Sequence, residues 1–405
     1  MSSRTHSTAA AELHAPPAVN VFLKVLPLTL SVFVAFITMG MQMPVLPLHL
    51  HGTLGMGPVV IGLIMGVAFA AALLSRAWAG NFADTRGAKP AMVLGFMVIA
   101  SSGLAYLASL AFVSVPNVSA WVLVIGRLLL ALGESLVVTG VLSLGVKLVG
   151  PHNAGKAMTW IGIAIYGAYS LGAPAGIALH TQWGFLGVAV ATVLTPLLAL
   201  AISISVPGVA PSSAVRTPFY KVLKTVWLPG LGLALSSVGF GMITAFIALL
   251  FAARHWGNAS LVFTAFGVAF IGARLFFGHL PDKLGGARVA LVCVIIEPLG
   301  LLLIWGAGSA LMAYLGAALA GFGYSLAFPG FGVEAVRRSP PQSRGAAMGA
   351  YVAFLDISLG ITTPLAGALA AYSGIGSVYL ASAVVVAMSI LVAVRLLTSK
   401  VAHHG

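Results

Sequence analysis

The sequence is dominated by long apolar blocks, each about 20 residues in length. A helix of that length spans the ~30 Å hydrocarbon core of a bilayer. The blocks are continuously apolar rather than alternating, which favours helices over the strands of a membrane barrel. Only 7% of the residues are charged, compared with roughly a quarter in soluble domains. Twelve blocks are found, beginning near Leu26, Val59, Ala91, Ala120, Met158, Phe185, Trp227, Leu261, Val289, Leu311, Met348 and Gly376. We therefore predict an all-α membrane protein with twelve transmembrane helices.

The basic residues fall in alternate connections between these blocks. If the N-terminal segment is cytoplasmic, nearly all loop lysines and arginines lie on the cytoplasmic side, and the external loops carry only Arg254. Positive charge is retained on the cytoplasmic side of membranes, so this pattern predicts that both termini are cytoplasmic. The net charge of +13 is then explained by topology and contact with the lipid bilayer, and no nucleic-acid partner is expected.

The blocks divide the chain into two halves. Residues 1–22 are polar and alanine-rich and are predicted to form a disordered cytoplasmic tail. Residues 23–206 and 226–398 are predicted to form an N-terminal and a C-terminal six-helix bundle. Residues 207–225 would be a short basic linker, and 399–405 a second cytoplasmic tail.

A small charged turn occurs once in each half. RAWAGNFADTRGAKP at 76–90 and RLFFGHLPDKLGGAR at 274–288 share the spacing R-x3-G-x3-D-x2-G. Further along, LGESL aligns with FGYSL and Pro174 with Pro364. Both turns lie on the predicted cytoplasmic side, so the halves are predicted to be parallel repeats related by an axis along the membrane normal.

Two parallel six-helix halves, each with a G-x3-D-x2-G turn between its second and third helices, resemble the major facilitator superfamily. The second turn is the fuller match, whereas the first has Thr85 where a base is expected, followed by Arg86. The chain is similar to bacterial facilitators described as drug or sugar (arabinose-type) exporters. The resemblance implies a multi-pass protein of the cytoplasmic (inner) membrane, expected to be monomeric, with no cofactor and with the proton gradient as its energy source.

The resemblance also implies a gate. Contacts at the two turns would latch the cytoplasmic side while the cavity faces outward; the alternative is that the turns only cap helices. Gly80 and Gly278 are expected to let neighbouring helices approach closely, and Gly87 and Gly285 to supply the tight turns. The predicted gate consists of Asp84, Arg86, Arg76, Gly80, Gly87, Asp282, Lys283, Arg288, Arg274, Gly278, Gly285 and Glu334.

Charged residues inside the apolar blocks are functional candidates because they are costly in hydrocarbon. Arg127 and Glu134 lie on one face of the fourth helix, ~10 Å apart along its axis. Asp356 in the eleventh helix has no base within two turns. The candidates for a proton carrier, a carboxyl that is neutral in one state and ionised in another, are Glu134 as the first choice and Asp356 as the second. The alternatives are a permanently protonated hydrogen-bonding acid and, for Arg127, a fixed ion pair between helices.

Further polar and small residues complete the predicted cavity. Gln42 on the first helix and Tyr324, which aligns with Glu134, are candidate substrate contacts. The segment YGAYSLGAPAG is similar to a glycine-proline motif associated with antiporters, unless its small residues only permit close helix packing. Its motif positions are Gly167, Gly172, Pro174 and Gly176. Glu297 is interpreted as a neutral acid that is hydrogen-bonded to a neighbouring helix. The histidines are scattered, and we do not expect them to form a metal site.

These features together predict a secondary transporter that works by rocker-switch alternating access. Its expected activity is the export of a small organic molecule in exchange for protons. The alternatives are an uptake symporter, a proton-independent facilitator and, outside transport, a non-transporting membrane sensor. An enzyme is not expected, because no H-E-x-x-H or G-x-S-x-G pattern is present. The segment GPHNAGKA has alanine where a nucleotide P-loop needs a hydroxyl.

Overall fold

The structure is a computed structural model that describes residues 21–150, 154–209, 219–339 and 344–399. Most of the predicted tails 1–22 and 399–405 (residues 1–20 and 400–405) and the centre of the predicted linker (210–218) lie outside the described residues, and α1 begins at Val21, inside the predicted first tail. The elements are α1 (Val21–Leu48), the π-helix η1 (His49–Thr53), α2 (Pro58–Thr85), α3 (Ala88–Leu110), α4 (Pro116–Val149), α5 (Ala154–Ser203), α6 (Phe219–Ala253), α7 (Ser260–Phe277), α8 (Leu280–Leu284), α9 (Gly286–Trp305), α10 (Ala310–Arg337), α11 (Arg344–Ser373) and α12 (Gly376–Thr398).

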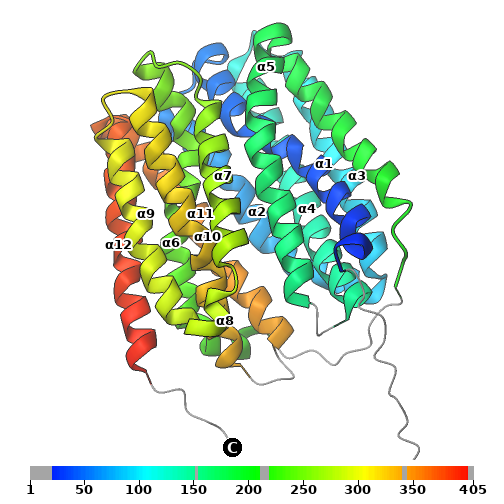
Figure 1. Cartoon of the computed structure of the whole chain (residues 1–405). Helices are drawn as coiled ribbons and strands as arrows, with labels where there is room; N and C mark the ends of the chain where they lie inside the picture. The colour runs from blue at the N-terminus through cyan, green and yellow to red at the C-terminus, as the bar shows by residue number, and fades with distance from the viewer. Residues whose placement is uncertain (1–20, 151–153, 210–218, 340–343, 400–405) are drawn as a thin grey trace, which may run out of the picture.

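The described residues contain eleven helices that are long and apolar enough to cross a membrane. One of them, α5, supplies two of the predicted segments. Its 50 residues are interrupted at Gly184, where φ is 61° and ψ is −157°, a conformation that glycine adopts without steric cost. Figure 1 shows the two arms of α5 meeting at the top of the view. The prediction of an all-α chain with twelve apolar segments is therefore confirmed.

The two halves repeat one packing scheme. In the N-terminal half (α1–α5), α1 packs on α5, α3 on α4, and α2 on α4. In the C-terminal half (α6–α12), the corresponding pairs are α6 with α11, α9 with α10, and α7 with α10. Figure 1 shows the halves side by side, with the N-terminal half on the right. The common scheme agrees with the internal repeat that the sequence predicts.

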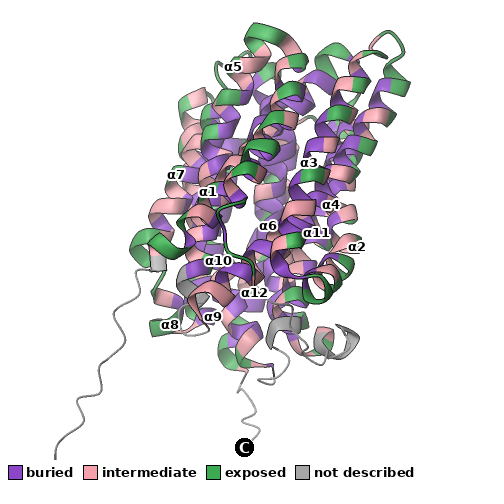
Figure 2. Cartoon of the chain, turned by 90° about the vertical axis from the view of Figure 1, so that its right-hand side faces the viewer, coloured by how far each residue is buried: buried purple, intermediate pink, exposed green. Residues whose placement is uncertain are grey.

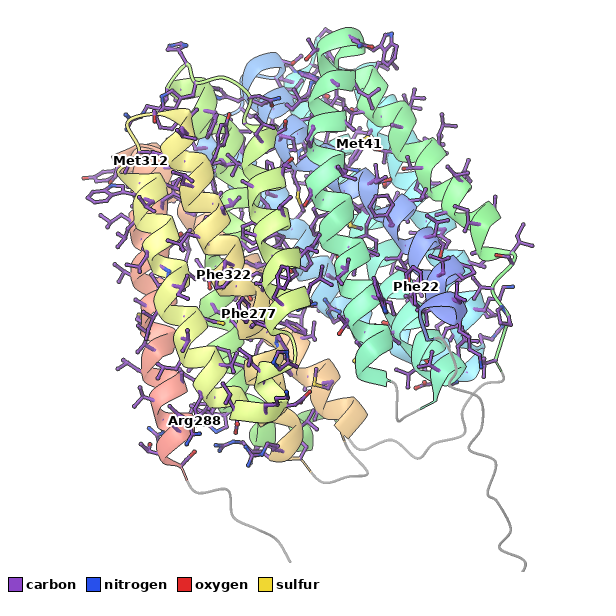
Figure 3. The ribbon with its side chains drawn as sticks, in the orientation of Figure 1. Phe22, Met41, Phe277, Arg288, Met312 and Phe322 are labelled. Atoms are coloured by element: carbon purple, nitrogen blue, oxygen red, sulfur yellow. The ribbon has the colours of Figure 1, made fainter. Side chains whose placement is uncertain are left out.

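The two ends of the bundle differ in charge. The chain enters α1 and leaves α12 at the same end, the lower one in Figure 1. Figure 3 shows Arg288 near this end and Met312 near the other. We call the lower end the basic end, because its helix termini and turns carry Arg86, Lys89, Lys147, Lys224, Lys283, Arg288, Arg337, Arg338 and Arg395. At the opposite end, Arg254 is the single lysine or arginine in the described connections.

Figure 2 colours the buried residues of the bundle purple. The apolar ones form one core at the opposite end and separate cores at the basic end. Leu50 of the N-terminal half and Phe246 of the C-terminal half belong to the same core at the opposite end. At the basic end, Phe96 belongs to a core within the N-terminal half and Phe331 to a core within the C-terminal half. The halves are thus joined by apolar packing at the opposite end but not at the basic end.

Candidate functional site: the helix crossings between the halves

The halves meet along two helix crossings, α2 with α11 and α5 with α7. At the α2–α11 crossing the backbones are close, since a Cβ atom added to Gly62 would lie 2.7 Å from the carbonyl oxygen of Thr363. At the α5–α7 crossing, Thr264 Oγ1 donates to the carbonyl oxygen of Ser170 at 2.8 Å. These two crossings position the charged and aromatic side chains of the candidate site.

An ion pair joins the halves at the α2–α11 crossing. Arg76 donates from Nε to Oδ2 of Asp356 and from Nη2 to Oδ1, the second at 3.0 Å. Such bidentate pairing is among the strongest forms of side-chain hydrogen bonding. The side chain of Asp356 is 2% exposed and that of Arg76 is 24% exposed. The pair therefore lies in the protein interior, and only its arginine is partly accessible to solvent.

This ion pair corrects the expectation for Asp356 and gives Arg76, a predicted gate residue, a partner outside the charged turns. The spacing along α11 predicts that Asp356 lacks a basic partner, because no base lies near it in the helix. The position of Arg76 just before the charged turn predicts a role in the cytoplasmic gate. The partners are 280 residues apart, and only the packing of α2 on α11 brings them together.

Glu134 and Arg127 extend this charged site along α4. Glu134 is partly accessible and lies within electrostatic range of Arg76, Asp356 and Arg127. Arg127 is 8% exposed, and its Nη2 donates to the carbonyl oxygen of Met65 on α2 at 3.3 Å. Arg127 thus connects two helices through a carbonyl, whereas Glu134 lies where it can interact with both arginines.

Two serines that the sequence did not single out as site residues hold α4 against α2 beside Arg76. Ser75 Oγ donates to Ser135 Oγ at 2.8 Å, and Ser135 Oγ also lies 3.3 Å from the carbonyl oxygen of Ala72. The position of Ser75 next to Arg76 in the sequence was the available signal. These bonds position the helix that carries Glu134.

Six aromatic residues gather at the α5–α7 crossing. Tyr166 stacks on Phe270 with ring centroids 3.7 Å apart, and Phe240 stacks on Tyr324 with centroids 5.7 Å apart. Three of the six are partly accessible, namely Tyr166, Tyr169 and Phe240. The cluster, which we call the aromatic cluster, consists of Tyr166, Tyr169, Phe240, Phe266, Phe270 and Tyr324.

The structure changes the ranking of the tyrosines. Tyr324, the predicted cavity residue, is 1% exposed, and its hydroxyl lies 3.4 Å from that of Ser237. It therefore supports the site from behind Phe240. Tyr166 and Tyr169, which no sequence signal favours, have partly accessible side chains and lie within electrostatic range of Glu134. Only the packing reveals which tyrosines remain partly accessible.

Gln42 lies away from the interface between the halves. It is 1% exposed; its Oε1 accepts from the Tyr106 hydroxyl at 3.0 Å and its Nε2 donates to Thr192 at 3.3 Å. All three residues belong to the N-terminal half. The prediction of Gln42 as a cavity residue is therefore wrong in this structure: α1 turns this face toward α3 and the second arm of α5.

The two charged turns lie at the basic end. Gly87 and Gly285 have φ of 105° and 93°, in agreement with the predicted tight turns. Their charged residues are all exposed in this conformation: Asp84, Arg86, Asp282, Lys283 and Arg288. The expected close approach at Gly80 is not found among the described residues, because none of their atoms lies within 4 Å of a Cβ atom added there. At Gly278 the three nearest atoms of the described residues all belong to Arg274 in the preceding turn, not to another helix.

Among the described residues, Glu334 forms no ion pair with a charged side chain of either turn. It is 3% exposed and accepts from the backbone N–H of Ala287, at the start of α9, at 3.4 Å. Its ion-pair partners are Arg337 at 3.3 Å and Arg338 at 3.9 Å, both on its own helix. An acid is favourable at a helix N-terminus, so Glu334 stabilises the α9–α10 packing.

The glycine-proline segment of α5 packs closely on α1. A Cβ atom added to Gly172 would lie 2.8 Å from the carbonyl oxygen of Ile37, and one added to Gly176 would collide with the Met41 backbone. Gly167 has only ordinary contacts, and Pro174 lies within the helix. These contacts support close helix packing, the alternative to an antiporter-specific role.

The remaining candidate residues form no second site. Glu297 is fully buried, and neither of its carboxyl oxygens has a hydrogen-bond partner among the described residues, so the expected bond to a neighbouring helix is not found there. His49 stacks on Phe185 with ring centroids 4.1 Å apart. Within the described part of the chain, no group of three or more His, Cys, Asp or Glu side chains could hold a metal ion.

Comparison with known proteins identifies the family. The sequence model of the Major Facilitator Superfamily matches residues 28–258 and 229–405. The chain is 41% identical to the uncharacterized MFS-type transporter STM4428 of Salmonella typhimurium, over 87% of this chain and 91% of that protein. It is 39% identical to the uncharacterized MFS-type transporter YhhS of Escherichia coli K12, over 94% and 95% of the two chains.

The fold is similar to that of solved transporters. A mutant of the nucleoside transporter NupG superposes with a TM-score of 0.74 at 13% sequence identity, and the match covers 92% of this chain and 99% of that one. At that identity the likeness concerns the fold. The family match and the two bacterial relatives show the class of protein, a transporter of this superfamily. The chain belongs to the major facilitator superfamily and is a multi-pass membrane transporter, not an enzyme.

Proposed function

We propose that this transporter exports a small organic molecule in exchange for protons, by alternating access of a site between its halves. The observation that carries the proposal is the Arg76–Asp356 ion pair, because its two members belong to different halves. Glu134 lies within electrostatic range of both. A titratable contact between two moving bodies is the element that a coupled transporter requires.

Protonation of Asp356 would remove the negative charge that Arg76 contacts. Neutralising one member of a buried ion pair leaves the charge of the other without compensation, which is strongly unfavourable. The α2–α11 crossing would then lose its charged contact, and the halves could rotate about their remaining apolar packing. Glu134 is a neighbouring carboxylate that can pair with Arg76 when Asp356 is neutral, because it lies within range of the same arginine.

Alternating access is supported by the division of the core. The halves share a core at the opposite end and have separate cores at the basic end. Under the positive-inside rule the basic end is cytoplasmic, which supports an inward-facing conformation. We propose that the turns containing Asp84 and Asp282 latch the cytoplasmic side in the outward-facing conformation.

Export is the proposed direction, supported by the similarity of the α5 glycine-proline segment to that of antiporters. Transport in proteoliposomes tests both coupling and direction. A panel of small organic molecules is measured with pH gradients of either sign, for the wild-type protein and for Asp356→Asn and Glu134→Gln. We expect substrate to move against the proton flux in the wild type. Each variant should retain downhill movement but lose its response to the gradient.

The matched control is Glu297→Gln, which changes a buried acid that forms no ion pair within the described residues. It should keep gradient-driven transport. An unchanged response to the gradient in both Asp356→Asn and Glu134→Gln would contradict the coupling role. Movement of substrate and protons in the same direction would instead show symport.

A further inference from the structure

The arginines that the sequence places inside the apolar blocks, Arg76, Arg127 and Arg274, differ in their partners. Arg76 is paired with Asp356. Arg127 has an acid within electrostatic range on its own helix. Arg274 on α7 forms no ion pair with any residue that the structure describes. Its nearest ionisable groups are tyrosines rather than acids.

Arg274 is held in place by two contacts, but most of its hydrogen-bond donors are unused within the described residues. Its Nη2 donates to the carbonyl oxygen of Ser325 at 3.2 Å, and its Cζ lies 4.8 Å from the ring centroid of Phe270. A guanidinium has five N–H donors, so one bond leaves most of them unused. Nη1 is directed at Gly162 on α5, where an added Cβ atom would collide with it. The side chain thus projects from the C-terminal half towards the N-terminal half, and it is partly accessible.

A cation in this position favours an anionic ligand. An unpaired charge in the membrane-spanning region is costly, and such charges commonly mark substrate pathways. The planar guanidinium matches a carboxylate in a two-point geometry that lysine cannot reproduce. A ligand carboxylate would supply at Arg274 the partner that Asp356 supplies at Arg76.

The aromatic cluster lies directly beside this cation. Phe270 lies under the guanidinium and stacks on Tyr166, and Tyr166 contacts Phe240, with ring centroids 5.9 Å apart. Tyr166 and Phe240 are partly accessible. Aromatic rings provide a flat apolar surface that favours stacking with another ring. A ligand bound through its carboxylate would place its remaining atoms on this surface.

We propose that the cargo is an organic monocarboxylate with a flat apolar or aromatic body, whose carboxylate is bound by Arg274 and whose body lies against the aromatic cluster. This inference rests on the proposed transport function and names the class of its substrate. The interior-negative potential of a cytoplasmic membrane also favours outward movement of an anion.

Binding to the purified full-length protein in detergent tests the inference without any proton gradient. The probes are phenylacetate and indole-3-acetate, each compared with its neutral carboxamide of nearly the same shape. We expect the wild type to bind each acid about tenfold more tightly than its amide, the ratio that one charge-assisted contact provides. Arg274→Gln should remove this preference by weakening acid binding and leaving amide binding unchanged, and Arg274→Lys should retain part of it.

The matched control is Arg254→Gln, an exposed arginine at the opposite end, which should bind both probes as the wild type does. Thermal unfolding and gel filtration of Arg274→Gln verify that it folds. The inference is overturned if the folded wild type binds acids no better than amides, if it binds neither acid at millimolar concentration, or if Arg274→Gln keeps the preference.

This outcome is independent of the coupling experiment. A carboxylate preference that depends on Arg274, in a protein whose transport ignores the pH gradient, would refute proton exchange and leave the substrate class intact. Gradient-driven transport of neutral or cationic molecules, by a wild type that shows no carboxylate preference, would refute the substrate class and leave proton exchange intact.

Discussion

The two crossings between the halves occupy equivalent places in the repeat but differ in chemistry. Arg76 and Arg274 are aligned by the charged turns, and the register that aligns Pro174 with Pro364 places Tyr166 on Asp356. At the α2–α11 crossing the arginine meets an acid of the other half. At the α5–α7 crossing it meets a tyrosine within electrostatic range and has no acid partner within the described residues.

The difference indicates a division of labour between two copies of one contact. An ion pair between the halves can be broken by a proton, so the α2–α11 crossing is suited to coupling. An arginine without an acid is available to a ligand, so the α5–α7 crossing is suited to binding. The repeat supplies the same scaffold twice, and a few substitutions in one copy give the two crossings different functions.

The largest expected effect concerns the ion pair itself. Arg76→Gln or Asp356→Asn alone should lower the free energy of unfolding by about 2–3 kcal/mol, because each leaves a charged partner in the interior without compensation. The double variant Arg76→Gln with Asp356→Asn should lose less than the sum, with a coupling energy of about 1–2 kcal/mol. Unfolding in detergent measures all three. Additive losses would show that the two side chains do not stabilise each other.

An intermediate effect is expected from making the second crossing resemble the first. Tyr166→Asp places an acid within range of Arg274 and should weaken binding of aromatic carboxylates about tenfold, since the arginine then has an internal partner. Equilibrium binding of phenylacetate measures the change. Tyr166→Asn, similar in size but neutral, is the control and should weaken binding less. Equal weakening in both variants would show that loss of the tyrosine ring, not the new charge, is responsible.

The smallest expected effect is the difference in stability, about 1 kcal/mol, between one glycine substitution at each crossing. Gly62→Ala should lower stability by about 1–3 kcal/mol, because its methyl group meets the backbone of α11, which cannot move aside locally. Gly267→Ala should cost less, about 1 kcal/mol, because the first atom it meets is the Ser170 hydroxyl, which can rotate. Thermal unfolding of both variants measures the difference. A larger loss for Gly267→Ala would show that the α5–α7 crossing is the more rigid of the two.

Much of the architecture follows from the sequence alone. Apolar blocks of membrane-spanning length, interrupted by turns, leave helices as the fold, because unpaired backbone groups are too costly in hydrocarbon. The spacing of Gly87 and Gly285 in two matching turns predicts their positive φ and the repeat of the halves. The break at Gly184 separates two of the predicted segments, which are the two arms of α5 in the structure.

The candidate site was predicted only in part. Glu134, Asp356 and Arg127 stand out because charges are rare in such helices, and all three lie near the interface between the halves. Gln42 stands out for a similar reason, as a polar residue in an apolar block, yet α1 turns it into the core of its own half. The direction in which a polar residue faces depends on helix rotation, and a helix that is apolar on all sides carries no amphipathic pattern to reveal it.

The sequence by itself determined the number of spans, the twofold plan and the distribution of charge between the ends, because these depend on composition and spacing along the chain. Only the tertiary structure decided that Arg76 pairs with Asp356 and that Arg274 lies beside aromatic rings without an acid. Both results depend on contacts between residues far apart in the sequence. Such contacts are set by how whole helices pack, which local spacing does not encode.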